Sequence, residues 1–85
     1  MNAYQRKDLE RAIHILKEAS KQAAELIATV REENEESYEN LPESLQVSDN
    51  GEEMKQAAET LADVELTLRE AIEFAIKNVE ELDLE

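Results

Sequence analysis

The residues of this sequence best suited to hold a metal ion or transfer protons are its twenty-two Asp and Glu side chains and its one His, His14. Two-metal sites in helical bundles combine inward-facing Glu residues with Glu-x-x-His motifs on facing helices. No Glu-x-x-His occurs here, because the nearest Glu before His14 is Glu10, four residues earlier. The chain also has no Cys, so thiolate ligands are excluded. We therefore expect the carboxylates to lie on outward faces, as a solvated acidic surface without a metal.

The segment Asp49-Asn50-Gly51 has the residue types of a calcium-binding loop but not the spacing. Aligning Gly51 with the fixed glycine of an EF-hand places Gln46 at the first ligand position and Ala57 at the last, where carboxylates are required. The sequence also offers no Ser/His/Asp or Cys/His set and no glycine-rich loop for a phosphate. We expect a protein that is not an enzyme and that binds no cofactor.

Four basic side chains could bind an anion: Lys7, His14, Lys17 and Lys21. Brought together across the subunits of an oligomer, they could form a pocket for a small anionic ligand such as a signalling nucleotide. The same pattern is equally typical of the polar side of an amphipathic helix whose cations pair with nearby carboxylates.

Charge is divided unequally along the chain. Residues 1–31 contain six Lys/Arg and four Asp/Glu, whereas residues 32–85 contain three Lys/Arg and eighteen Asp/Glu. The net charge of −13 repels nucleic acid and anionic membrane surfaces, so direct binding to nucleic acid is not expected. A rod of closely spaced carboxylates can instead imitate the charge of a duplex. The candidate acidic face for that role consists of Glu32, Glu33, Glu35 and Glu36.

Composition and periodicity predict an all-α fold. One Gly, one Pro and three aromatic residues accompany many Ala, Glu, Leu and Lys, which favour helices. We expect a single domain over 1–85 that is an antiparallel two-helix hairpin. Its helices span about 4–38 and 50–82, and a Pro-containing connector at 39–49 joins them. The predicted inward residues of the first helix are Leu9, Ile13, Leu16, Ser20, Ala23, Ile27 and Val30. Those of the second are Met54, Ala57, Leu61, Val64, Leu68, Ala71, Ala75, Val79 and Leu82, widened by Ala58, Ile72 and Ile76.

The connector is expected to close one end of the hairpin. Pro42 ends the first helix because its ring disrupts the hydrogen-bond ladder, and it could open a short helical segment capped by Asn40. The apolar side chains expected to plug the end of the hairpin are Leu41, Leu45 and Val47. The favourable N-caps for the second helix are Ser48, Asp49 and Asn50.

Several large apolar side chains fall outside both predicted inward stripes. They are Tyr4, Ile15 and Leu26 in the first helix, and Leu66 and Phe74 in the second. A second apolar face on a two-helix protein usually means that another chain packs there. We therefore expect a homo-oligomer in which these residues form the oligomer or partner face, with an antiparallel dimer that makes a four-helix bundle as the leading form and a larger oligomer as the alternative.

The stretch Tyr38-Glu39-Asn40-Leu41-Pro42-Glu43-Ser44-Leu45-Gln46, followed by Ser48, Gly51-Glu52 and Met54, resembles a pattern found in a family of small acidic helical-hairpin proteins. Phages, prophages and mobile elements of Gram-positive bacteria encode these proteins. The resemblance covers about residues 32–82, and this chain departs from it at Asn50, where members often carry Arg or another polar residue. Because the family has no assigned activity, the resemblance implies a source and a fold but no site.

Three functions remain open from the sequence. The first is a phage-type interaction protein that oligomerises and binds a host or defence protein, in part through the acidic face. The second is an oligomeric sponge for an anionic signalling nucleotide, and the third is a purely architectural bundle. The absence of Cys, of a secretory signal and of a long apolar run favours the cytoplasm of the bacterial host cell.

Overall fold

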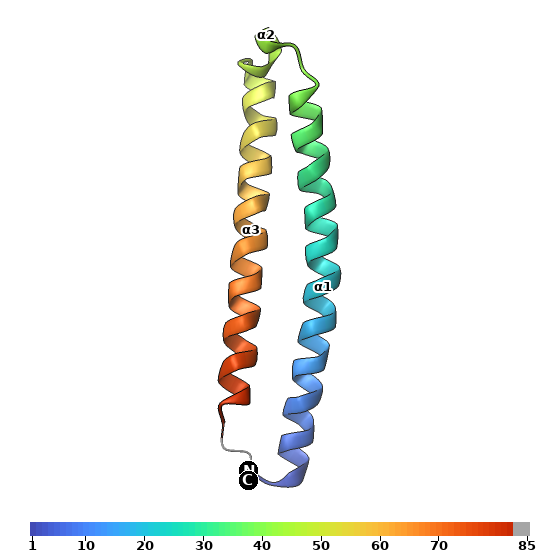
Figure 1. Ribbon diagram of the computed structural model, residues 1–85, viewed down its shortest axis with the longest axis vertical. Helices are drawn as coiled ribbons and strands as arrows, with labels where there is room; N and C mark the ends of the chain where they lie inside the picture. Colours follow the sequence, from blue (N-terminus) through green and yellow to red (C-terminus); the bar gives the residue numbers. More distant parts are fainter. Residues whose placement is uncertain (83–85) are drawn as a thin grey trace.

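The computed structural model describes residues 1–82, and it confirms the all-α prediction, since the described residues contain helices and no strand. The helices are α1 (Ala3–Glu39), α2 (Glu43–Gln46) and α3 (Asp49–Glu80). Figure 1 shows α1 and α3 running antiparallel side by side, with α2 at the end where the chain turns. The molecule is a rod with principal extents of 63 × 16 × 13 Å.

The first helix begins one residue earlier than predicted because a capping box fixes its N-terminus. The Asn2 side chain accepts a hydrogen bond from the backbone N–H of Gln5 (2.9 Å), and the Gln5 side chain accepts one from the backbone N–H of Asn2 (3.2 Å). Two backbone donors that have no partner within the helix are thereby satisfied. Asn40 is the C-cap of α1 and not, as expected, the N-cap of the next helix.

The connector is held by backbone and amide hydrogen bonds. Pro42 precedes α2 as its N-cap without a side-chain hydrogen bond, and its carbonyl accepts from the N–H groups of Leu45 and Gln46. The Gln46 side-chain amide donates to the carbonyls of Tyr38 (3.2 Å) and Leu41 (3.1 Å), which ties α2 to the end of α1. Of the three candidate caps for α3, Ser48 is the N-cap, and its hydroxyl accepts from the N–H of Gly51 (3.2 Å).

Gly51 lies where α3 passes under the connector, and it is one of two buried residues in that helix. A Cβ added there would lie 2.5 Å from the carbonyl oxygen of Gln46 and 2.8 Å from its carbon, so only glycine fits. The predicted apolar plug is largely wrong: Leu41 is half-buried, but Leu45 and Val47 are 49% and 76% exposed. The close backbone approach at Gly51, and not a plug, closes this end.

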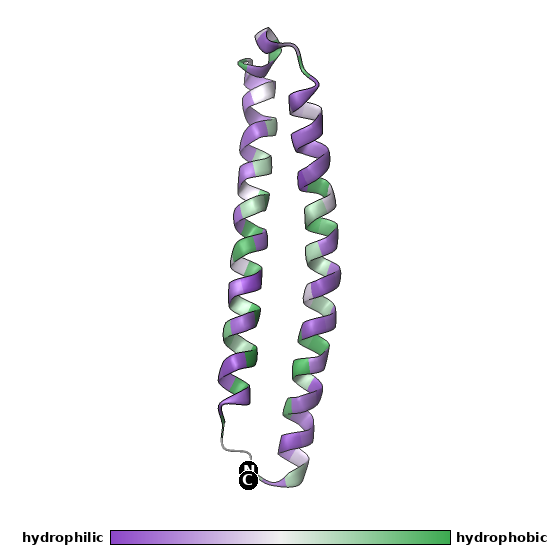
Figure 2. Cartoon of the chain, viewed as in Figure 1, coloured by the Kyte–Doolittle hydropathy of each residue, from purple (hydrophilic) through white to green (hydrophobic). Residues whose placement is uncertain are grey.

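The stripe that α1 presents to α3 agrees with the prediction as far as Ile27 and then departs from it. The expected residue Val30 is exposed, and the half-buried positions beyond Ile27 are Ala28, Arg31, Asn34 and Tyr38. Figure 2 shows hydrophilic residues dominating these last turns of α1. Ala23, Ile27 and Arg31 are separated by four residues each, instead of by four and three in turn, so the inward stripe shifts around the helix. Polar residues occupy this shifted stripe near the connector.

The predicted stripe of α3 is confirmed in large part but is centred differently, because the buried or half-buried residues include Met54, Leu61, Leu68, Ala75 and Val79 together with the widening residues Ala58, Ile72 and Ile76. Ala57, Val64 and Ala71, which were expected to face α1, are exposed, and Leu82 lies beyond the helix end and is also exposed. The buried and half-buried residues alternate in steps of three and four: Gly51, Met54, Ala58, Leu61, Glu65, Leu68, Ile72, Ala75 and Val79, with Ile76 beside them. This is the heptad spacing of paired helices. It includes one carboxylate, so the expectation that all acids face outward is wrong for Glu65.

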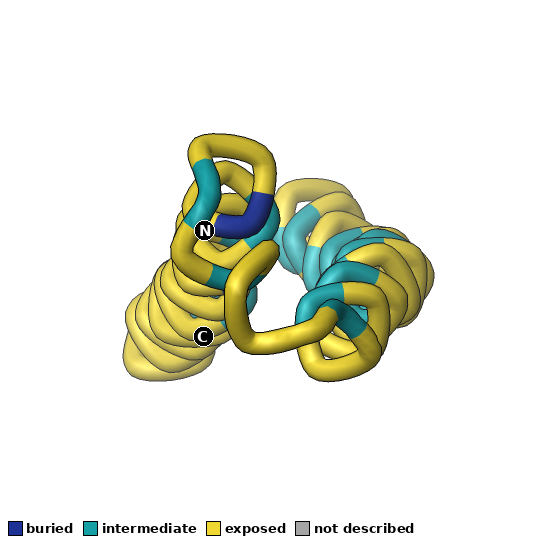
Figure 3. The backbone as a smooth tube through the Cα atoms, turned by 90° about the horizontal axis from the view of Figure 1, so that it is seen from above, coloured by how far each residue is buried: buried dark blue, intermediate teal, exposed yellow. Residues whose placement is uncertain are grey.

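The pair of helices has almost no core of its own. Ala58 is the only buried apolar side chain among the described residues, and every large apolar side chain there is half-buried or exposed. Figure 3 shows the half-buried residues gathered between the two long helices, while the outer sides are exposed. The apolar area that this thin rod leaves in water does not gain the stabilisation of about 25 cal/mol per Å² that burial would provide.

Candidate functional site

Arg31 is the centre of the densest side-chain network among the described residues. From its inward position on α1, its Nε and Nη2 donate to the Glu65 carboxylate on α3, with Nη2 at 3.4 Å from Oε1. Nη1 lies 3.1 Å from both oxygens of Glu35, and Nη2 lies 3.9 Å from Glu32. The side chains of Arg31 and Glu65 are only 23% and 18% exposed. The guanidinium therefore bridges the two helices and forms ion pairs with three carboxylates.

This network suits a structural role. The hydrogen bonds that Arg31 donates to Glu65 and then to Glu35 raise its pKa above the ordinary value, because they stabilise the charged guanidinium. A permanently charged group cannot donate or accept protons in a reaction. What the network can do is fix the register of α1 against α3, because sliding by one turn would separate Arg31 from Glu65.

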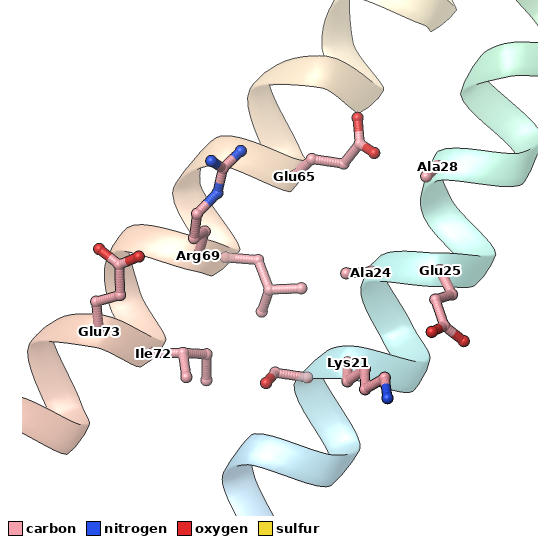
Figure 4. Close-up of a pocket in the computed structure, with 10 residues that line it drawn as sticks. Lys21, Ala24, Glu25, Ala28, Glu65, Arg69, Ile72 and Glu73 are labelled. Atoms are coloured by element: carbon pink, nitrogen blue, oxygen red, sulfur yellow. The ribbon is translucent and has the colours of Figure 1, made fainter.

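A groove runs between the two long helices, next to the network. It has a volume of about 460 Å³, and its apolar lining comes from Ala24 and Ala28 of α1 and from Leu68 and Ile72 of α3. Figure 4 shows Glu65 and Ile72 extending from α3 towards α1, with Lys21 and Glu25 on the opposite helix and Arg69 and Glu73 on α3. Arg69 and Lys21 are exposed and form no ion pair with any of residues 1–82.

The structure divides the four predicted acidic-face residues into two kinds. Glu35 and Glu32 lie beside Arg31, which neutralises part of their charge. Glu33 and Glu36 are exposed and have no ion pair within the described part of the chain. Because consecutive residues of a helix are about 100° apart, the four carboxylates spread around nearly half of α1 and do not share one narrow face.

The four predicted anion-binding residues form a row and not a pocket. Lys7, His14, Lys17 and Lys21 are exposed and make no ion pair within residues 1–82. Each directly follows a half-buried residue of α1, so they share one flank of the helix. From Lys7 to Lys21 this row is about 21 Å long at 1.5 Å per residue. Of the four, only Lys21 lines the groove.

All five predicted oligomer-face residues are exposed, but they do not lie on the same side of the helix pair. Ile15, Leu26 and Phe74 directly precede half-buried residues, whereas Leu66 directly follows one and lies on the opposite flank of α3. Tyr4 belongs to neither flank and is 83% exposed near the N-terminus. Ile15, Leu26 and Phe74 therefore share one side of the helix pair, whereas Leu66 and Tyr4 lie apart from them and from each other.

Residues 1–82 contain no cluster of three His, Asp or Glu side chains placed to hold a metal ion. None of the described helices combines the length and the apolar character that a membrane crossing requires. Comparison of the chain with protein-family models, with curated proteins and with solved structures finds no significant match.

Proposed function

We propose that this chain is a non-enzymatic interaction protein of the cytoplasm that acts as a homo-oligomer and binds a partner protein with a basic surface. In this proposal the antiparallel hairpin is half of a four-helix bundle. One observation carries it: the segment from residue 25 to residue 70 contains fourteen Asp/Glu and three Lys/Arg, a net charge of −11 out of −13. This segment forms the connector end of the rod. Such concentrated charge attracts basic surfaces at long range.

The proposed partner is a host or defence protein of a bacterium that carries a phage or mobile element. The resemblance of residues 32–82 to acidic hairpin proteins of such elements supports this source. A partner that normally binds nucleic acid is favoured, because carboxylates spread around the end of α1 present negative charge on several sides, as a duplex does. Binding of this kind weakens steeply as salt is added.

The structure selects the carboxylates to test. Glu33→Lys with Glu36→Lys changes the two acids that Arg31 does not neutralise. Glu10→Lys with Glu18→Lys makes the same change in net charge on exposed residues of the same helix, away from the acidic end. A tagged chain is used to capture proteins from bacterial lysate at low salt, and the partner is identified by mass spectrometry. We expect the first variant to lose the partner and the second to retain it; equal capture by both, or no capture by the parent, contradicts the proposal.

The nucleotide sponge remains a second candidate because of the groove. Its apolar lining could hold a base, and Lys21 and Arg69 on opposite walls could reach a phosphate. The test is a thermal melting shift with cyclic dinucleotides and mononucleotides, using Lys21→Glu with Arg69→Glu as the variant. A stabilisation of several degrees that the variant abolishes supports the sponge, whereas no shift with the parent excludes it for those ligands. If neither test gives binding, the architectural bundle is the function that remains.

A further inference from the structure

The two flanks of the helix pair differ in charge. Every inward residue has one neighbour before it and one after it in the sequence, about 100° to either side. Because α1 and α3 are antiparallel, the preceding neighbours of both helices share one side of the pair, and the following neighbours share the other. The groove identifies the second side, since it is lined by Lys21 and Arg69, which follow the inward residues Ser20 and Leu68.

The preceding neighbours carry no formal charge along the central length of their side, and we call this set of residues the uncharged face; Asp63 borders it. In α1 it consists of Ala12, Ile15, Ala19, Gln22, Leu26 and Val30. In α3 it includes Val64, Ala71 and Phe74, with four further uncharged residues at the same spacing from Ala57 to Asn78. The corresponding positions on the opposite side carry seven formal charges. Uniform absence of charge over both helices is what the centre of a protein interface requires.

Five of the large apolar side chains that are exposed lie on the uncharged face. Leu26 and Phe74 are 71% and 70% exposed, and Ile15, Val30 and Val64 are between 41% and 56% exposed. They come from both helices, so they form a broad surface and not isolated side chains. On the opposite side, the corresponding positions include one exposed large apolar residue, Leu66, because Ile76 is half-buried.

The accessible surface of the chain leaves room for one second copy. The chain exposes 6613 Å², whereas a compact monomer of 9.7 kDa is expected to expose about 5,100 Å². The excess, about 1,500 Å², is within the range of roughly 1,000–2,500 Å² that each subunit of an obligate dimer buries. A face of this kind that closes on itself by two-fold symmetry also needs no partner of different chemistry.

The charge distribution selects the orientation of the second copy. The connector end carries −11 from residues 25 to 70, and the rest of the chain carries only −2. A two-fold axis along the rod would place two −11 ends side by side. A two-fold axis perpendicular to the rod separates those ends by the length of the bundle and places each beside the nearly neutral end of the other copy, where Lys7, Lys17 and Lys21 lie.

We propose that the uncharged face packs against the same face of a second copy, about a two-fold axis perpendicular to the helices, with the two acidic ends at opposite ends of a four-helix bundle. In this arrangement α1 faces α1 of the partner and α3 faces α3. The groove and the basic row remain on the outside. The inference rests on the oligomerisation proposed above and adds which face is buried and how the copies are oriented.

Native mass spectrometry with matched variants tests which face is buried. We expect the parent to have twice the 9.7 kDa mass of one chain. Leu26→Gln with Phe74→Gln is expected to weaken the dimer about a hundredfold or more, whereas Leu66→Gln, on the charged side, leaves it unchanged. A dimer that Leu66→Gln weakens and the double variant does not overturns the proposed face while the oligomer stands. A helical monomer from the parent overturns both, and means that a different protein covers this face.

Single cysteines test the orientation and remain informative if the double variant fails to fold. The chain has no native Cys, so each introduced thiol is unique. Ala71 lies near the centre of the uncharged face, and Ala71→Cys is expected to form a disulfide-linked dimer readily on oxidation. Thr60→Cys, on the same face, is displaced along α3, so the two thiols of a dimer are about 30 Å apart in the proposed orientation and are expected not to link. Equal linkage at both positions, or more at position 60, overturns the proposed orientation.

Discussion

Replacing Arg31 by methionine is expected to destabilise the chain more than any other single charge removal. Methionine keeps the length and apolar stem of the side chain but removes the guanidinium that bridges α1 and α3. Glu65 then keeps its charge at a position 18% exposed and loses the one ion-pair partner that it has among the described residues. Glu35 and Glu32 lose the same partner.

The size of the effect follows from the burial of the pair. Removing one partner of a fully buried ion pair costs about 3–5 kcal/mol, and exposed pairs contribute about 0.2–1 kcal/mol. With both side chains about four-fifths buried, Arg31→Met is expected to lower the free energy of unfolding by about 2–3 kcal/mol. Glu65→Met is expected to cost less, about 1 kcal/mol, because Arg31 keeps two hydrogen bonds to Glu35. The double variant is expected to lie near the parent, because two apolar side chains then meet in the stripe.

The assay is urea unfolding followed by far-ultraviolet circular dichroism, at one fixed chain concentration for all variants. Lys77→Met is the matched control, because Lys77 and Glu81 are 3.9 Å apart on the outside of α3 with side chains 75% and 62% exposed. That control is expected to change the unfolding free energy by less than about 0.5 kcal/mol. If Arg31→Met costs no more than Lys77→Met, or if the double variant is as unstable as the two singles summed, the bridging role assigned to Arg31 is wrong.

Three further changes test the connector end, each read from the urea midpoint at fixed concentration. Gly51→Ala should lower stability by about 1–3 kcal/mol because the new Cβ meets the connector backbone, whereas Asn50→Ala, one residue away and exposed, should be neutral or slightly stabilising; equal effects would contradict the close approach. Ser48→Ala should cost about 1 kcal/mol through loss of the cap to Gly51, and Ser48→Asp should restore most of it. Gln46→Ala should cost about 1–2 kcal/mol because two amide hydrogen bonds to the end of α1 disappear; an unchanged midpoint would show that water satisfies those carbonyls equally well.

The sequence predicted the first part of α1 well because most of its large apolar residues recur there at alternating steps of four and three, whereas Ile15 and Leu26 are eleven residues apart. From Leu9 to Ile27 the residues at alternating steps of three and four are the half-buried ones. Beyond Ile27 the inward position belongs to Arg31, and apolar periodicity carries no signal for a charged inward residue. A signal was available in principle: Arg31 is four residues before Glu35, which is the spacing of a helix ion pair.

The stripe of α3 was displaced for a different reason. That helix has two neighbouring apolar stripes, one through Ala58, Leu61 and Ile72 and one through Val64 and Ala71. A sequence pattern cannot say which of them faces α1, because both satisfy helical spacing. The structure places Glu65 in the inward stripe, where Arg31 compensates its charge, and this leaves Val64 outside. The same rotation places Phe74 on the side of the helix pair that holds Ile15 and Leu26, and Leu66 on the other side.

Ala58 is the one buried apolar side chain among residues 1–82, and in the proposed dimer this has a consequence for how much folded protein a cell contains. In a bundle whose core is completed by a second copy, folding and association are one event. Each tenfold rise in chain concentration then adds about 1.4 kcal/mol to the stability of the assembly. In the proposed dimer, newly made chains would be open to proteases while they are scarce and would persist once they are abundant. The rate of synthesis would then act as a switch, because folded protein would accumulate more steeply than the chains that compose it.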